Sequence, residues 1–285
     1  MRVAAFVSLL ALLFSGCIQH IALSSLGGIM DSGFDVLNEE QDLGIAEKSI
    51  ASNLILLETL LRKDPDNLHY AFLASEGYTS YTLGFVEDDS VERANVLYRR
   101  AMEYGLRVLR HHREFAAAET MSAGEMRSVL ASFTKDDVPA VFWTALAWGS
   151  WIRTDLGNAK ALADLPKVEA MMEFVAETDP GYFYGGGDLF LGTLEGSRPR
   201  ALGGDPEASR RHFEKSLGAS GGKFLMEYVY YARSYAVQTQ DRELFDRCLT
   251  TVDTTSINVL PAARLSNAIA KKKAKLLRAK ADEYF

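Results

Sequence analysis

Residues 138–180 constrain the fold more than any other segment, because they hold all three tryptophans within two successive amphipathic patterns. In the first pattern, apolar residues recur at spacings of four, three and four, which is the period of an α-helix. These residues are Val141, Ala145, Trp148 and Ile152. Trp143, Ala147 and Trp151 extend the apolar face around most of the helix predicted for residues 140–154, so we expect neighbouring helices to cover it on several sides.

A second helix is predicted from about Leu165, where Pro166 is tolerated in the first turn. Asp179-Pro180 ends it, because a residue before proline avoids the α conformation. Small residues at the contact between the two helices would allow them to pack as an antiparallel hairpin. These small residues are Ala145, Ala147 and Gly149. The pair is expected to pack like a tetratricopeptide-type repeat.

Helical periods also dominate the rest of the chain, and no alternating strand pattern of credible length occurs. Two small–aromatic–small triplets have the spacing with which a tetratricopeptide helix accepts its neighbour. They are Ala94, Tyr98, Ala101 and Ser209, Phe213, Ser216. The intervals between repeats are irregular. We therefore predict an all-α fold in which irregular tetratricopeptide-like helical hairpins form an α-solenoid-like bundle.

The N-terminus has the composition of a secretion signal. Arg2 precedes an apolar stretch from Val3 to Phe14, which is too short to span a bilayer, and Ser15-Gly16-Cys17 follows. This ending resembles the lipobox of bacterial lipoproteins, in which the cysteine becomes the acylated first residue. The alternative is an ordinary cleaved signal peptide in which Cys17 has no special role.

On the lipoprotein interpretation, residues 1–16 are the signal peptide and residues 17–33 form an acylated cysteine and a tether. Residues 34–285 then form a single tetratricopeptide-like helical domain. Several acyl chains on Cys17 would anchor the protein stably, since one chain binds membranes only marginally. Ile18 after the cysteine favours retention at the outer membrane, with the body in the periplasm.

Other classes of function have little support. The net charge of −7 argues against a nucleic-acid partner. His111 and His112 would point about 100° apart on a helix, so they share no metal-ligand face, and a solvated helix end explains them better. Cys248 has no disulfide partner if Cys17 is acylated. No nucleophile motif or catalytic carboxylate pair is present, so we expect no enzyme activity, no cofactor and no metal.

Aromatic residues gather in three segments, residues 70–81, 182–190 and 224–235. Core packing accounts for most of them, but tyrosine combines an apolar ring with a polar tip and suits the wall of a ligand groove. We predict that the glycine-rich segment after Pro180 and the helix predicted for residues 223–240 contribute to one cavity. The predicted lining residues are Tyr184, Phe190, Tyr228, Tyr231 and Tyr235.

Five blocks in a fixed order resemble the T component of TRAP transporters. They are WTALAWGSWI (143–152), LPKVEAMM (165–172), GGDPEASRRHFEKSL (203–217), YARSYAV (231–237) and RLSNAIAKKKA (264–274). The similarity covers nearly all of the chain after Cys17. Asp188 departs from the family pattern, in which a histidine is expected at this position.

The resemblance implies an accessory periplasmic lipoprotein of a TRAP importer. Its partner would be the periplasmic substrate-binding (P) subunit, and it would assemble as a homo-oligomer such as a trimer. Each subunit would have a cavity or pore that binds or conducts a small organic acid or a more hydrophobic ligand. A generic tetratricopeptide-like scaffold lipoprotein for envelope assembly is the alternative. An apolar cavity through the body would favour the first function, and a solid core with one exposed groove the second.

Overall fold

The structure is a computed structural model that describes residues 28–200 and 203–285. Within these residues the regular secondary structure is helical and no strand occurs, which confirms the all-α prediction. Residues 28–38 form a first helix. The further α-helices are α2 (Leu43–Lys63), α3 (Leu68–Phe85), α4 (Val91–Leu109), α5 (Ala123–Leu130), α6 (Val138–Arg153), α7 (Ala159–Leu162), α8 (Leu165–Thr178), α9 (Gly186–Gly196), α10 (Pro206–Ser220), α11 (Met226–Tyr230), α12 (Arg242–Thr254), α13 (Arg264–Ala279) and α14 (Ala281–Tyr284).

Side-chain caps set where many of these helices begin. The carboxylate of Asp42 accepts hydrogen bonds from the backbone of Gly44 and Ile45 at the start of α2. Ser90 caps α4 and Asp205 caps α10 in the same way. Such caps satisfy backbone N–H groups that have no partner within the helix. Helix starts were therefore predictable from local sequence.

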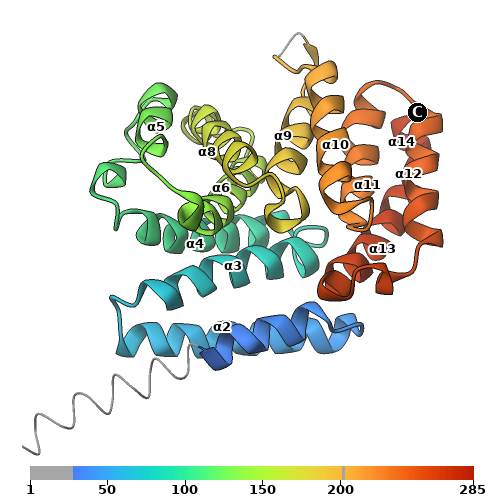
Figure 1. Ribbon diagram of the computed structural model, residues 1–285. Helices are drawn as coiled ribbons and strands as arrows, with labels where there is room; N and C mark the ends of the chain where they lie inside the picture. Colours follow the sequence, from blue (N-terminus) through green and yellow to red (C-terminus); the bar gives the residue numbers. More distant parts are fainter. Residues whose placement is uncertain (1–27, 201–202) are drawn as a thin grey trace, which may run out of the picture.

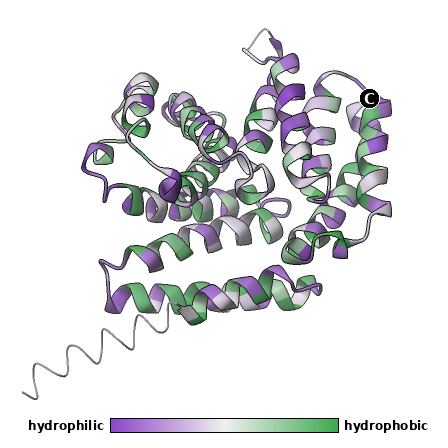
Figure 2. Ribbon diagram, in the orientation of Figure 1, coloured by the Kyte–Doolittle hydropathy of each residue, from purple (hydrophilic) through white to green (hydrophobic). Residues whose placement is uncertain are grey.

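Consecutive helices pack against one another, as the tetratricopeptide-like pattern predicts. Helix α3 contacts α2 and α4, α4 contacts α6, α6 contacts α8, and α9 contacts α10. Figure 1 shows this succession as a curved stack from the blue N-terminal helices to the red C-terminal ones. All six residues of the two small–aromatic–small triplets are fully buried at these contacts. In Figure 2, green and purple residues alternate along the outer helices, while α3 and α6 are buried on most sides.

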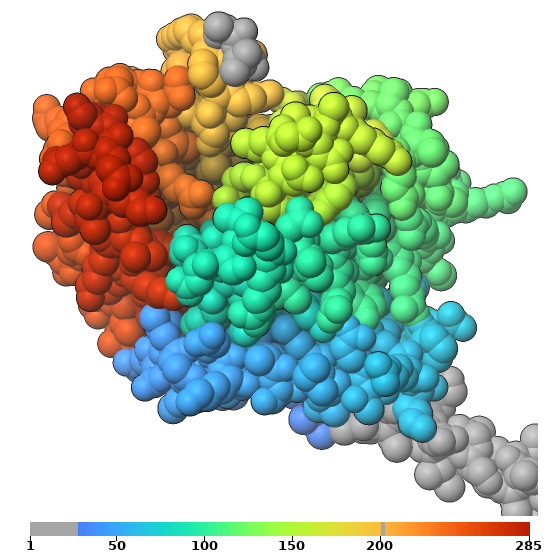
Figure 3. Space-filling view, turned by 180° about the vertical axis from the view of Figure 1, so that it is seen from behind, coloured from blue at the N-terminus to red at the C-terminus, as the bar shows by residue number. Residues whose placement is uncertain are grey.

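The C-terminal part of the chain closes back on the N-terminal part. Helix α13 contacts α11, α12 and α2, and Figure 3 shows the red C-terminal helices beside the blue and cyan N-terminal ones. Asn267 on α13 holds this helix against the start of α11, because its Oδ1 accepts a hydrogen bond from the backbone N–H of Leu225 at 2.8 Å. The stack therefore closes around an interior instead of remaining an open solenoid.

Two expected boundaries differ from the structure. Residues 28–33, which we assigned to the tether, are helical, and the side chain of Met30 in this helix is buried. The helix predicted for residues 223–240 runs over residues 226–238, and its middle part is a π-helix, η5 (Tyr231–Ala236). The predicted signal peptide and Cys17 lie outside the described residues. Among the described helices, none is both long enough and apolar enough to cross a membrane.

Candidate functional site: an apolar cavity

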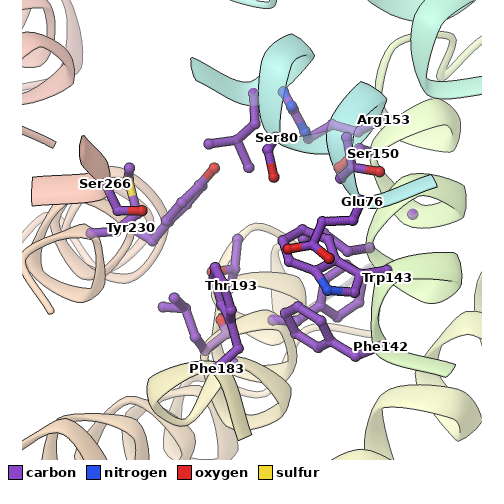
Figure 4. Close-up of a pocket in the computed structure, with 18 of the residues that line it drawn as sticks. Glu76, Ser80, Phe142, Trp143, Ser150, Arg153, Phe183, Thr193, Tyr230 and Ser266 are labelled. Atoms are coloured by element: carbon purple, nitrogen blue, oxygen red, sulfur yellow. Dashed lines mark hydrogen bonds between the residues drawn. The ribbon is translucent and has the colours of Figure 1, made fainter. Parts of the chain in front are cut away.

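The helices enclose a cavity of about 360 Å³, which falls within the range of small-molecule sites. Its wall comes from α3, α6, α9, α11 and α13, together with the helix of residues 28–38. Most of this wall is apolar. Representative lining residues are Leu83, Phe142, Leu146, Leu189, Phe224 and Ile269. Figure 4 shows side chains from several of these helices directed toward one common space.

Close helix packing builds the wall between α6 and α9. A Cβ atom at Gly149 would lie 2.5 Å from Cζ of Phe190 and 3.2 Å from Cγ1 of Val168 on α8. Only glycine therefore lets the Phe190 ring lie against α6. Gly149 and Phe190 both line the cavity, so this approach fixes one side of its shape.

A strained turn supplies another part of the wall. Phe183 and Tyr184 have φ values of 44° and 60°, followed by Gly185 at 81°. A left-handed conformation at two bulky residues costs on the order of 1–3 kcal/mol each. Aromatic packing opposes this cost, since the Phe183 ring lies 4.9 Å from that of Trp143 and 5.7 Å from that of Phe224. The turn thereby holds Phe183 over the cavity.

Glu76 on α3 places a carboxylate in this apolar wall. Figure 4 shows it directed toward the space between Trp143, Thr193 and Tyr230. Within the described part of the chain, no hydrogen bond or ion pair satisfies it. Burial, and then the charges of Asp31 and Asp35 on the first helix, raise the pKa of Glu76 to about 7. A carboxylate left unpartnered in such a place is costly for folding.

One of the two arginines that line the cavity is already neutralised. Arg153 lines the cavity, but its Nη2 donates to Oε2 of Glu87. Glu87 also accepts from the Tyr98 hydroxyl at 2.6 Å and from Lys273 Nζ at 2.9 Å. Burial alone would raise the pKa of Glu87, but the charges of Arg153 and Lys273 and these hydrogen bonds lower it to about 2. Glu87 therefore stays ionised, and Arg153 has no free charge to offer a ligand.

Of the five residues predicted to line a cavity, Phe190 lines this one, and the four tyrosines are not among its lining residues. Tyr231 stacks on Phe213 of α10, with ring centroids 4.5 Å apart, and Tyr235 lies 5.2 Å from Tyr231. Tyr184 stacks behind Phe224 at 5.0 Å, and the hydroxyl of Tyr228 lies beside Gly222. These four tyrosines lie outside the wall of this cavity, because their stripe packs largely toward α10 and its flanking loop.

Sequence reasoning missed Tyr230 and Glu76. Tyr230 is one residue along from the predicted Tyr231, a rotation of about 100° on a helix, and it faces the cavity. A signal for Glu76 was present: within α3, which is largely buried, it is the only acidic residue and no lysine or arginine occurs. A single carboxylate in a buried helix requires either a partner or a function.

Asp188, the departure from the family pattern, has a structural role. It is buried at the start of α9, and its Oδ1 lies 2.7 Å from Nδ1 of His212 on α10. His112 likewise lies 2.8 Å from Asp137. In the described ranges, no group of three or more His, Cys, Asp or Glu residues is arranged to hold a metal ion.

Comparison with known proteins gives two matches. The family model described as "TRAP transporter T-component" matches residues 39–285. An uncharacterized protein of Treponema pallidum (strain Nichols) is 24% identical over 317 residues, which covers 100% of this chain and 98% of that protein. The family match confirms the resemblance that the five sequence blocks indicate.

Proposed function

The chain belongs to the TRAP transporter T-component family, and from this premise we propose that it is a non-catalytic periplasmic accessory lipoprotein. In this function it docks the periplasmic substrate-binding (P) subunit of a TRAP importer. It also binds a small organic-acid or hydrophobic ligand in its helical cavity, or conducts it through. The observation that carries the ligand part is the apolar cavity of about 360 Å³ inside the helical body.

A closed stack of helices does not need an internal cavity in order to be stable. Protein interiors are close-packed, and an unfilled apolar cavity reduces stability in proportion to its volume. A cavity of this size, lined by side chains from at least five helices, is therefore more consistent with a ligand-binding function than with a purely structural one. The strained turn at Phe183 and the unpartnered Glu76 support the same interpretation.

The location and assembly of the protein complete the proposal. Acylation of Cys17 would anchor the chain, with the outer membrane as the expected site because Ile18 follows the cysteine. The helical body would then stand in the periplasm beside its partner. We expect a homo-oligomer, such as a trimer, in which each subunit keeps its own cavity.

Affinity capture tests the docking function. The tagged full-length protein is expressed in its native host, solubilised in mild detergent and captured at low and at physiological salt, and co-purifying proteins are identified by mass spectrometry. We expect a TRAP-type substrate-binding protein at both salt concentrations. The purified pair should then associate in size-exclusion chromatography. Recovery of envelope assembly factors, with no substrate-binding protein at either salt concentration, would contradict the proposal.

The alternative function, a scaffold lipoprotein for envelope protein assembly, has one observation in its favour. A polar surface groove of about 590 Å³ lies between α2 and α4, lined by both charge signs. In it, Glu58 accepts hydrogen bonds from the hydroxyls of Tyr78 and Tyr104, both at 2.9 Å. Such a surface suits a protein partner, whereas it does not explain the interior cavity. The transport function accounts for both.

A further inference from the structure

We propose that the side chain of Glu76 binds the polar head group of the cavity's ligand. This ligand is a largely apolar molecule whose polar end donates a hydrogen bond and carries no negative charge. A long-chain alcohol is the simplest member of this class. The inference rests on the proposed function, because it assigns a ligand class to the same cavity.

The first support is that Glu76 is the one acidic side chain among the lining residues that the structure describes. The hydroxyls of Thr79 and Thr193 donate to backbone carbonyl groups one helical turn earlier, at 2.7 and 2.8 Å. Ser197 does the same at 2.6 Å. These three groups are satisfied within their own helices, and the other uncharged polar residues of the wall are Asn38, Ser80, Ser150, Tyr230 and Ser266. The carboxylate of Glu76 is an acceptor with no donor within the described residues, and an apolar site with a few fixed polar groups is how proteins orient ligands.

The second support is the sign of the charge around Glu76. The two charged groups that act on it most strongly are Asp31 and Asp35, both acidic. Arg153 is held by Glu87. An anionic head group placed at Glu76 would therefore meet like charge in an apolar environment, where repulsion is strong. A hydroxyl, by contrast, would give the carboxylate the hydrogen bond that it lacks, and bonds to charged acceptors are the stronger ones.

Arg198 offers the competing mode of binding. It also lines the cavity, and its Nε is buried without a hydrogen-bond partner, although its Nη2 donates to Glu195 at 2.8 Å. A carboxylate ligand would bind there if anywhere. A head group bound at Glu76 would be an uncharged hydrogen-bond donor, whereas one bound at Arg198 would be a carboxylate. Measuring the affinity for one ligand of each class therefore distinguishes the two contacts.

Trp143 provides the readout. It lines the cavity, whereas Trp148 and Trp151 are not among the lining residues, so a bromine atom on a bound chain should quench mainly Trp143. The probes are 11-bromo-1-undecanol and 11-bromoundecanoic acid, which differ only at the head group. The full-length acylated protein is placed in phosphatidylcholine vesicles at pH 8, where the probe acid is ionised, and partitioning into lipid is measured separately. A Trp143→Phe variant should lose most of the quenching in both titrations.

We expect the alcohol to bind at least tenfold more tightly than the acid. In Glu76→Gln, the ratio of the two affinities should fall to within threefold of unity, because the amide has a similar shape and no charge. Glu177→Gln, a change at an exposed glutamate on α8, should leave the ratio unchanged. The discrimination by the unmodified protein is itself a test that does not depend on how any variant folds.

Two outcomes would overturn the inference. If the acid binds as tightly as the alcohol to the unmodified protein, and Arg198→Gln abolishes acid binding, the head group belongs to Arg198 and the proposed ligand-binding function survives. If neither probe quenches Trp143 at any concentration below its solubility limit, the cavity takes no chain-like apolar ligand. The ligand part of the proposed function then fails together with the inference.

Discussion

Lys273 donates a hydrogen bond from Nζ to Oε1 of Glu87 at 2.9 Å, and each of the two side chains is only 3% exposed. The two residues are 186 positions apart. Lys273 also reaches Asp88 at 2.6 Å, while Arg153 and Tyr98 occupy the other oxygen of Glu87. This buried cluster joins α13 to the α3–α4 loop, α4 and α6. It therefore connects the two ends of the helical stack on one side of the cavity.

Lys273→Met should destabilise the protein strongly. Without Lys273, the carboxylates of Glu87 and Asp88 share one positive partner, Arg153, so one negative charge of the cluster is uncompensated. Loss of one partner of a buried ion pair costs about 3–5 kcal/mol. We expect this loss in the free energy of unfolding, measured by urea denaturation at pH 7. Lys275→Met, at an exposed position on the same helix, should change it by less than about 0.5 kcal/mol. Equal effects of the two substitutions would show that the cluster does not hold the C-terminal helices in place.

Glu227 predicts a pH dependence of stability. Its side chain is fully buried and accepts hydrogen bonds from Ser216 at 2.7 Å and Ser220 at 2.6 Å. Burial outweighs these bonds and raises the pKa of Glu227 to about 7. The folded state therefore holds a proton that the unfolded chain loses near pH 4.3. This contribution to stability is present at low pH and is lost as the pH rises through 7.

Glu227→Gln should remove this loss of stability at high pH. Relative to the unmodified protein, its free energy of unfolding should improve by on the order of 3 kcal/mol between pH 4.5 and pH 8. Urea denaturation at several pH values measures the difference, and comparison with the unmodified protein cancels the similar contribution of Glu76. Glu177→Gln should show no such trend. A difference that does not vary with pH would mean that Glu227 is ionised in the fold.

Gly149→Ala tests the wall between α6 and α9. The new methyl group would meet the Phe190 ring at 2.5 Å, and overpacking of this kind costs about 1–3 kcal/mol. In Gly218→Ala, on α10, the added Cβ meets nothing within 4 Å, so helix propensity should stabilise the protein by up to about 1 kcal/mol. Thermal denaturation should thus move in opposite directions for the two variants. A shift of the same sign would contradict the close approach of Phe190.

The lipobox-like sequence that ends at Cys17 predicts that this cysteine is acylated. Cells supplied with labelled palmitate should incorporate the label into the unmodified protein and into Cys248→Ser, but not into Cys17→Ser. Cys248 serves as the matched control because it is a buried thiol on α12, and burial raises its pKa to about 12. Electrophoresis followed by detection of the label is sufficient. Absence of label from the unmodified protein would favour the ordinary signal-peptide alternative, and label retained in Cys17→Ser would place the acyl chain on another residue.

Local sequence predicted the helices well, because their causes are local. Asp42, Ser90 and Asp205 satisfy backbone groups within three residues of themselves, and Asp64 and Asp179 stand immediately before prolines that a helix cannot continue through. The small–aromatic–small triplets also predicted which helix faces would be buried. Periodicity sufficed for these features because each depends on residues within a few turns of one another.

The cavity depended on the tertiary structure. Its wall combines residues from Phe34 to Ile269, and the sequence pattern does not specify the rotation of each helix about its axis. That rotation placed Tyr230 in the wall and Tyr231 against Phe213. Lys273, one partner of Glu87, lies 186 positions away from it. The apolar surroundings of Glu76 likewise come from helices distant in sequence. The sequence thus determined which segments are helical and which face of each helix is apolar. The position of the cavity was decided by the tertiary structure, in which α13 closes onto α2. Packing between helices that are distant in sequence depends on all of these helices together.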